Sequence, residues 1–165
     1  MNRWSRLWLY SSLFHGAVAA LLTLLIVVPA LEIPRIISGG GAGTWFTIGY
    51  IMYLLGGPLG SIGFSVLYAG VGTGGSALNS RLGWLHLTLT NLGVMSACYQ
   101  LIYGGYIAGY MQHIAPSITG EPVDLGAVHL FLVRFVTPIG ASVLLTALSL
   151  MIGIVNIMIL LRKES

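Results

Sequence analysis

Four long apolar stretches, separated by short polar or glycine-rich segments, account for most of the chain. They are Trp8 to Leu31, Trp45 to Tyr68, Leu82 to Met111 and His129 to Leu161. Each is longer than the roughly 20 mostly apolar residues that a helix needs to cross a bilayer. The pattern predicts an all-α integral membrane protein, with residues 1–165 forming a single domain of four transmembrane helices.

The basic residues predict how these helices are oriented. Five of the seven Lys and Arg residues lie on one side of the predicted spans: Arg3, Arg6, Arg81, Arg162 and Lys163. Three of the four acidic residues lie in the two loops on the other side: Glu32, Glu121 and Asp124. Since cytoplasmic loops carry an excess of Lys and Arg, we expect a multi-pass protein of the cell membrane with both termini in the cytoplasm.

A secretory signal peptide is the competing interpretation of the first stretch, because Arg3 and Arg6 precede its apolar run. The apolar part of a signal peptide has about 7 to 15 residues and leads to a cleavage site between small residues. The run from Trp8 to Leu31 is longer, and no clear site of that kind follows it. The sequence therefore favours a transmembrane helix.

Composition excludes several classes of protein. Charged residues make up only 7% of the chain, against about 25% in a soluble domain, so the chain cannot build a water-facing surface and is not expected to be a soluble globular protein. The single cysteine, Cys98, excludes an internal disulfide or a thiolate metal site within this sequence. The net charge of +3 comes from scattered residues and forms no basic patch, so we expect no nucleic-acid partner.

Glycine is abundant, with 23 residues, and predicts close helix packing. Lipid supplies no hydrophobic drive for helices to associate, so small residues at an interface let van der Waals contact replace it. The predicted packing glycines fall in the second and third stretches: Gly49, Gly56, Gly60 and Gly63, then Gly105 and Gly109. We expect Gly56 and Gly60 to form a tight helix contact, and Pro58 between them to kink the helix.

Four histidines are candidate functional residues, because an ionisable side chain within a span is costly and often has a role. His15 and His86 lie near the predicted cytoplasmic side, and His113 and His129 lie at the outer side. Paired histidines from two helices can ligate haem b through its two axial positions. A hydrogen bond to a neighbouring backbone is the simpler role for each of them, so the sequence leaves both open.

Other polar residues within the spans have less specific roles. Arg134 could snorkel to the outer interface, pair with Glu121 or Asp124, or contact a partner's carboxylate or haem propionate. Asn91 and Asn156 are expected to join helices by hydrogen bonds, worth about 1 kcal/mol each. Four tyrosines recur on one face of the third stretch: Tyr99, Tyr103, Tyr106 and Tyr110. The deeper two need hydroxyl partners, so we expect that face to meet another protein surface.

Missing motifs narrow the chemistry. No predicted span contains a carboxylate, which disfavours a proton-coupled transporter with the usual buried acid. The sequence has no HExxH, GxSxG or phosphate-binding loop. We therefore assign no catalytic residue and no metal site to this chain.

Parts of the sequence resemble the catalytic subunit of haem-copper oxidases and the related nitric oxide reductases. The stretch that begins LGWLHLTLTNLGV and ends IYGGYIAGY is similar to that family's penultimate helix. The fourth stretch resembles its last helix, with Arg134, Gly140 and Asn156 at matching positions. The first two stretches resemble its first two helices, including FTIGYI at the start of the second. The resemblance implies a related membrane scaffold.

The departures from that family matter as much as the matches. A histidine in the family's second helix ligates the low-spin haem, but the corresponding segment here, YLLGGPLG, has Leu54 and Leu55 instead. The middle helices, which supply the other haem and metal ligands, have no counterpart in four spans. The resemblance thus implies a scaffold without the reactive centre.

Three functions follow as hypotheses. The first is a non-catalytic integral membrane subunit of a respiratory or other membrane oxidoreductase complex, which contacts other integral subunits and lipids and binds no cofactor by itself. The second is a small membrane cytochrome b that holds haem through its histidine pairs. The third is a four-span channel or transporter, against which the missing carboxylates count.

Overall fold

The structure is a computed structural model that describes residues 1–71 and 79–164. Within these residues the regular elements are all helices. The long ones are α1 (Arg3–Ile26), α3 (Gly43–Leu54), α4 (Gly60–Val71), α5 (Ser80–His113) and α7 (Leu125–Glu164). The short ones are a 3₁₀ turn η1 (Pro29–Leu31), α2 (Ile33–Ser38), a π turn η2 (Leu55–Leu59) and α6 (Ala115–Thr119). The expected all-α fold is confirmed for the described residues.

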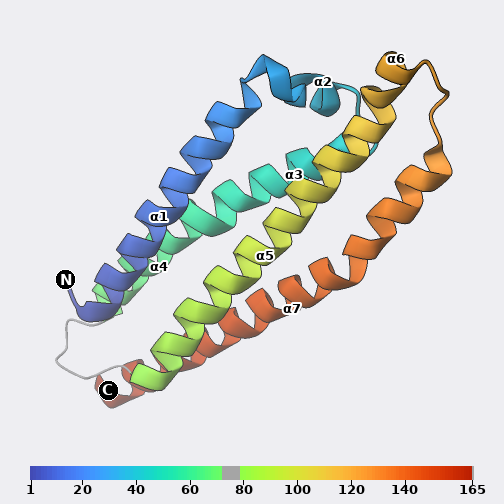
Figure 1. Cartoon of the computed structure of the whole chain (residues 1–165). Helices are drawn as coiled ribbons and strands as arrows, with labels where there is room; N and C mark the ends of the chain where they lie inside the picture. Colours follow the sequence, from blue (N-terminus) through green and yellow to red (C-terminus); the bar gives the residue numbers. More distant parts are fainter. Residues whose placement is uncertain (72–78, 165) are drawn as a thin grey trace.

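Four antiparallel rods make up the bundle: α1, the combined α3–η2–α4, α5 and α7 (Figure 1). The two chain ends lie at the same end of the bundle (Figure 1). Helix α5 packs most extensively against α7 and then against α3, while α1 packs chiefly against α4 and η2. At the opposite end α1 diverges from α3, and α2 lies beside the gap between them (Figure 1).

Local sequence fixes the helix ends. The side chain of Asn2 accepts a hydrogen bond from the Ser5 amide, and Asn79 caps α5 in the same way. Helix α1 ends at Ile26, before the expected limit at Leu31. Val28 is extended and precedes Pro29, and the helical conformation is disfavoured for a residue before proline.

The second rod is interrupted at the predicted proline. Residues Leu55–Leu59 form a π turn with Pro58 inside it. Proline has no amide hydrogen and disturbs the helix ladder at its position. The Ser12 hydroxyl of α1 donates a hydrogen bond of 2.8 Å to the Pro58 carbonyl, so the interruption is also a contact point between helices.

Three helices are long and apolar enough to cross a membrane: Arg3–Ile26, Gly43–Val71 and Leu125–Ile159. The expectation of four such spans is therefore met only in part. The predicted span from Leu82 to Met111 does form one helix, α5, but it is less apolar than the others. Polar side chains such as Thr90, Asn91 and Gln100 lower its hydropathy, and they bond to neighbouring elements or within α5.

Glycines bring α5 into close contact with its neighbours. A Cβ atom added at Gly105 would collide with the backbone of Phe46 in α3, and one at Gly109 would collide with Ile36. A Cβ atom added at Gly49 would also collide with Leu101, and Gly56 lies beside Val94. The tight contact expected at Gly60 is not formed, since a Cβ there would meet only its own helix, and the space beside Gly63 is open.

Candidate functional site

A buried histidine in the middle of α1 is the centre of a polar network. His15 Nδ1 lies 2.8 Å from the Tyr53 hydroxyl, and His15 Nε2 lies 2.6 Å from Oδ1 of Asn91. The Ser11 hydroxyl donates to the same Asn91 oxygen at 2.6 Å and lies 3.2 Å from the Ser61 hydroxyl. Side chains from α1, α3, α4 and α5 thus meet at one point.

This network is enclosed. His15 is 1% exposed and Tyr53 4% exposed. A Cβ atom at Gly57, in the π turn, would lie 3.2 Å from the His15 ring, so the missing side chain there makes room for the imidazole. Polar groups in such a site are costly unless hydrogen bonded, and the contacts above satisfy both ring nitrogens of His15.

A second tyrosine and histidine pair lies nearer the chain ends. The Tyr68 hydroxyl is 2.9 Å from His86 Nδ1, and both side chains are fully buried. The rings of Trp8 and Phe64 pack against His86, with centroids 4.8 and 4.6 Å away. On the fourth side lies Gly153 of α7, where a Cβ atom would collide with the imidazole.

Three buried polar nitrogens near this second pair have no hydrogen-bond partner in the described residues. They are Nε2 of His86, Nε1 of Trp8 and Nδ2 of Asn156. Asn156 does act as a link between segments, because its Oδ1 accepts a hydrogen bond from the Asn79 amide at 3.2 Å. The second pair is therefore only partly satisfied, unlike the His15 network.

The predicted inner haem pair, His15 and His86, has a definite arrangement. The two rings belong to separate clusters, and no ring contact joins them within the described residues. An iron ligand needs a free ring nitrogen lone pair. Both nitrogens of His15 are hydrogen bonded, whereas Nε2 of His86 is unpaired. Haem ligation at His15 would have to break one of its two bonds.

The predicted outer pair has a different setting. His113, at the end of α5, lies 3.2 Å from the Gly40 carbonyl through Nε2, and its ring packs beside Gly39. His129 is exposed on α7. The structure thus places one histidine in a loop contact and the other on the surface.

Arg134 is also exposed, and it forms no ion pair within the part of the chain that the structure describes. The carboxylate of Asp124 instead accepts a hydrogen bond from the Ala127 amide at the start of α7. Of the roles left open for Arg134, an ion pair with Glu121 or Asp124 is therefore not formed within the described residues.

Hydroxyl and amide groups also line the contact between α5 and α7. Thr90 and Ser149 lie 2.6 Å apart, and Ser149 donates to the His86 carbonyl at 2.7 Å. Farther along, the Gln100 amide and the Ser96 hydroxyl bond to Ser142. Interhelical hydrogen bonds of this kind hold helices together where lipid gives no hydrophobic drive.

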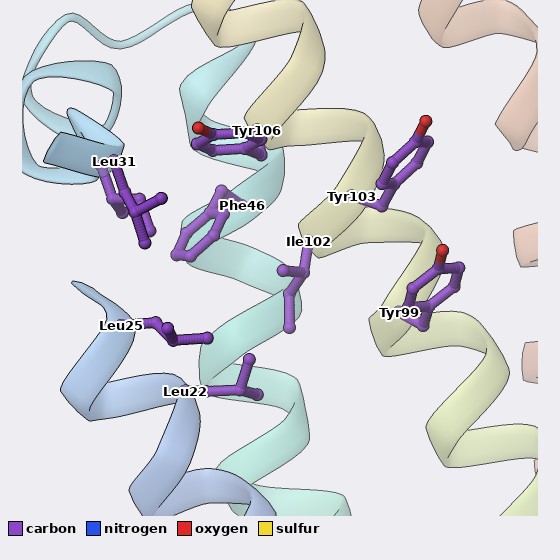
Figure 2. A pocket seen from close by; sticks show the side chains of 9 residues that line it. Leu22, Leu25, Leu31, Phe46, Tyr99, Ile102, Tyr103 and Tyr106 are labelled. Atoms are coloured by element: carbon purple, nitrogen blue, oxygen red, sulfur yellow. The ribbon is translucent and has the colours of Figure 1, made fainter. Parts of the chain in front are cut away.

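The tyrosine face of α5 borders an apolar crevice. A cavity of about 280 Å³ lies where α1 diverges from α3 and α5, and Figure 2 shows its lining side chains. They are Leu22, Leu25, Leu31, Ile33, Phe46, Tyr99, Ile102, Tyr103 and Tyr106. The Tyr99 and Tyr103 rings stack at 5.8 Å, and their hydroxyl groups point away from the leucines of α1 (Figure 2).

Neither of these two hydroxyl groups has a hydrogen-bond partner among the described residues, and the side chains are 65% and 43% exposed. Tyr99 lies 14 residues before the end of α5 at His113, or about 21 Å along the helix. The unpaired hydroxyl group of Tyr99 therefore lies near the middle of α5 and not at its end. The sequence predicts that this face meets another protein surface, and the structure leaves Tyr99 exposed while the Tyr103 ring contacts Phe135 of α7.

Tyr53 is the site residue that sequence reasoning missed. It lies eight residues from the outer end of the second predicted span, whereas His15 lies seven residues from the cytoplasmic end of the first, so the predicted spans do not place the two at one depth. No group of three or more His, Cys, Asp or Glu side chains that could hold a metal occurs within residues 1–71 and 79–164.

Comparisons with known proteins give no relative for this bundle. No family model, no curated protein and no solved structure matches the chain.

Proposed function

We propose that this chain is a non-catalytic integral subunit of a membrane complex and that it packs against other membrane-embedded subunits through the tyrosine face of α5. The observation that carries the proposal is the exposed, unpaired hydroxyl group of Tyr99. Transfer of an unpaired hydroxyl group from water to hydrocarbon costs about 4 to 8 kcal/mol. A partner helix with a hydrogen-bond acceptor would remove that cost.

The proposal includes a fourth crossing by α5. Three rods qualify as spans by length and composition, and α5 connects the end of α4 to the start of α7 at opposite ends of the bundle (Figure 1). A connection between those two points has to cross the same thickness of membrane. The lower hydropathy of α5 is tolerable because α3 and α7 cover two of its sides. With the basic residues inside, both termini are cytoplasmic.

The kind of complex is inferred from the sequence resemblance alone. The similarity to the first two and last two helices of haem-copper oxidases suggests a membrane oxidoreductase complex as the partner. In that complex the chain would supply a scaffold, and the partner would supply the cofactor.

The test uses a photo-activated crosslinking amino acid at position 99 in membranes that contain the native partners. We expect a protein adduct at position 99 and mainly lipid adducts at Leu144, which is similarly exposed on α7. A matched Tyr99→Phe change should lower the yield of the co-purified complex. Lipid adducts alone at position 99 would contradict the proposal.

A small cytochrome b is the second candidate, and the unpaired, fully buried Nε2 of His86 favours it. A reduced-minus-oxidised visible spectrum of the purified chain, with haem quantified per mole of protein, separates the two. Stoichiometric haem that His86→Ala removes would establish the cytochrome. A folded chain without haem would leave the subunit as the better candidate.

A further inference from the structure

The orientation of the Asn91 side chain determines where the proton of His15 lies. The amide nitrogen of Asn91 donates to the Leu87 carbonyl at 2.6 Å, so the other amide atom, Oδ1, faces His15. A carbonyl oxygen only accepts hydrogen bonds. His15 Nε2 must therefore carry a hydrogen and donate it to Asn91.

The second ring nitrogen follows from the first. A neutral imidazole has one protonated nitrogen and one lone pair, so with Nε2 protonated the lone pair is on Nδ1. The Tyr53 hydroxyl, 2.8 Å away, has to donate its hydrogen to that lone pair. The contact is thus a buried phenol whose proton already points at a base.

This arrangement suits one kind of chemistry. A phenol that loses an electron becomes a strong acid, and inside a membrane no water is available to take its proton. A base held at hydrogen-bond distance removes that obstacle, as positioned bases do in proton transfers generally. We infer that Tyr53 is a redox-active tyrosine, oxidised reversibly with His15 as its proton acceptor.

One electron leaves Tyr53 for an oxidised metal centre in a partner subunit, which is reduced by one electron. The O–H bond of Tyr53 breaks, and an N–H bond forms at Nδ1 of His15. The products are a neutral tyrosyl radical and an imidazolium ion, and re-reduction returns the proton to the phenol. The physiological oxidant belongs to the partner in the proposed function, but the proton transfer depends on this chain alone.

Three other tyrosines serve as internal controls. Tyr99 and Tyr103 have no base near their hydroxyl groups, since neither makes a hydrogen bond among the described residues. Tyr68 does face His86, but no group fixes the proton of that imidazole, because its Nε2 is unpaired. The proposal therefore selects Tyr53.

The experiment uses the purified full chain in phosphatidylcholine nanodiscs, without any partner, and a membrane-soluble ruthenium photo-oxidant. Electron paramagnetic resonance after a light flash should show a tyrosyl radical in the wild-type chain. Tyr53→Phe should abolish the signal, whereas Tyr99→Phe and Tyr68→Phe should retain it. His15→Gln keeps a hydrogen-bonding side chain but removes the base, and should slow radical formation about a hundredfold or more.

Several results would overturn the inference. These are no radical in the wild-type chain, an undiminished radical in Tyr53→Phe, or an unchanged rate in a folded His15→Gln chain. Tyr53→Phe retains the aromatic packing, so it keeps the test valid even where His15→Gln does not fold. Because no partner is present, failure here would leave the subunit proposal standing, and failure of the crosslinking test would leave this one standing.

Discussion

The two buried tyrosine and histidine pairs differ at the nitrogen that the tyrosine does not touch. In both, a phenol lies within 2.9 Å of Nδ1. Asn91 fixes the proton on the far side of His15, whereas nothing in the described residues faces the far side of His86. The partner of the second ring nitrogen therefore decides whether the first one donates or accepts a hydrogen bond.

The surroundings of the two tyrosine and histidine pairs also differ. His15 belongs to a polar network built by four elements, while His86 fills an aromatic box closed by Gly153. One site is specified by hydrogen bonds and the other by shape. Substitutions at matched positions in the two sites should therefore have different effects.

The largest difference is expected when each histidine is replaced by leucine. His15→Leu leaves the buried Tyr53 hydroxyl without its partner, which costs about 1 to 3 kcal/mol, and it removes one of the two donors to the Asn91 oxygen, the other being Ser11. We expect a loss of about 3 kcal/mol. His86→Leu also takes the His86 partner from the buried Tyr68 hydroxyl, but it removes a ring nitrogen that is already unpaired and retains apolar packing, so we expect a smaller loss of about 1 kcal/mol. Denaturation of both variants in detergent micelles measures the two losses, and equal values would show that the sites do not differ.

The next largest effect concerns the glycine beside each ring. Gly153→Ala should destabilise the chain by about 1 to 3 kcal/mol, because the added methyl group would overlap the His86 imidazole. Gly57→Ala should cost less than about 1 kcal/mol, since its Cβ would lie 3.2 Å from His15. Thermal melting in detergent compares them. Gly63→Ala, at an open helix position, is the control and should not destabilise.

A smaller effect is expected from removing the group that fixes the proton. Asn91→Leu should cost about 1 kcal/mol and release the His15 tautomer. Nitrogen NMR of the imidazole should show a single form protonated at Nε2 in the wild-type chain and a mixture in the variant. A mixture in the wild-type chain would contradict the assignment.

The smallest effect is expected at the tyrosine face. Tyr99→Phe should change the stability of the isolated chain by less than about 0.5 kcal/mol, because its hydroxyl makes no bond within the described residues. Tyr53→Phe loses the bond to His15 and should cost about 1 kcal/mol. Melting of the two variants side by side tests whether only the buried hydroxyl contributes.

The helices can be predicted from the sequence more easily than the site. Apolar runs predict long helices because lipid demands them, and the ends differ mainly where a local feature intervenes, as at Pro29. The third apolar stretch was expected to be a span like the others, but α5 is less apolar than they are. A helix covered on two sides by other helices can carry more polar residues. The position of His15 along its helix could be predicted from the sequence, but its contact with Tyr53 could not. Hydropathy does not determine how a helix is rotated or which helix it packs against.

The π turn has a consequence for the register of the second rod. In an uninterrupted α-helix, eight residues separate Tyr53 from Ser61 and would turn the two side chains about 80° apart. A π turn accommodates one extra residue, so the pair behaves as if seven residues apart, which is close to two full turns. Both side chains can then face α1, where they contact His15 and Ser11. The π turn thus corrects the rotation of the second rod, and deleting Pro58 would keep this alignment while turning the π turn into plain α-helix.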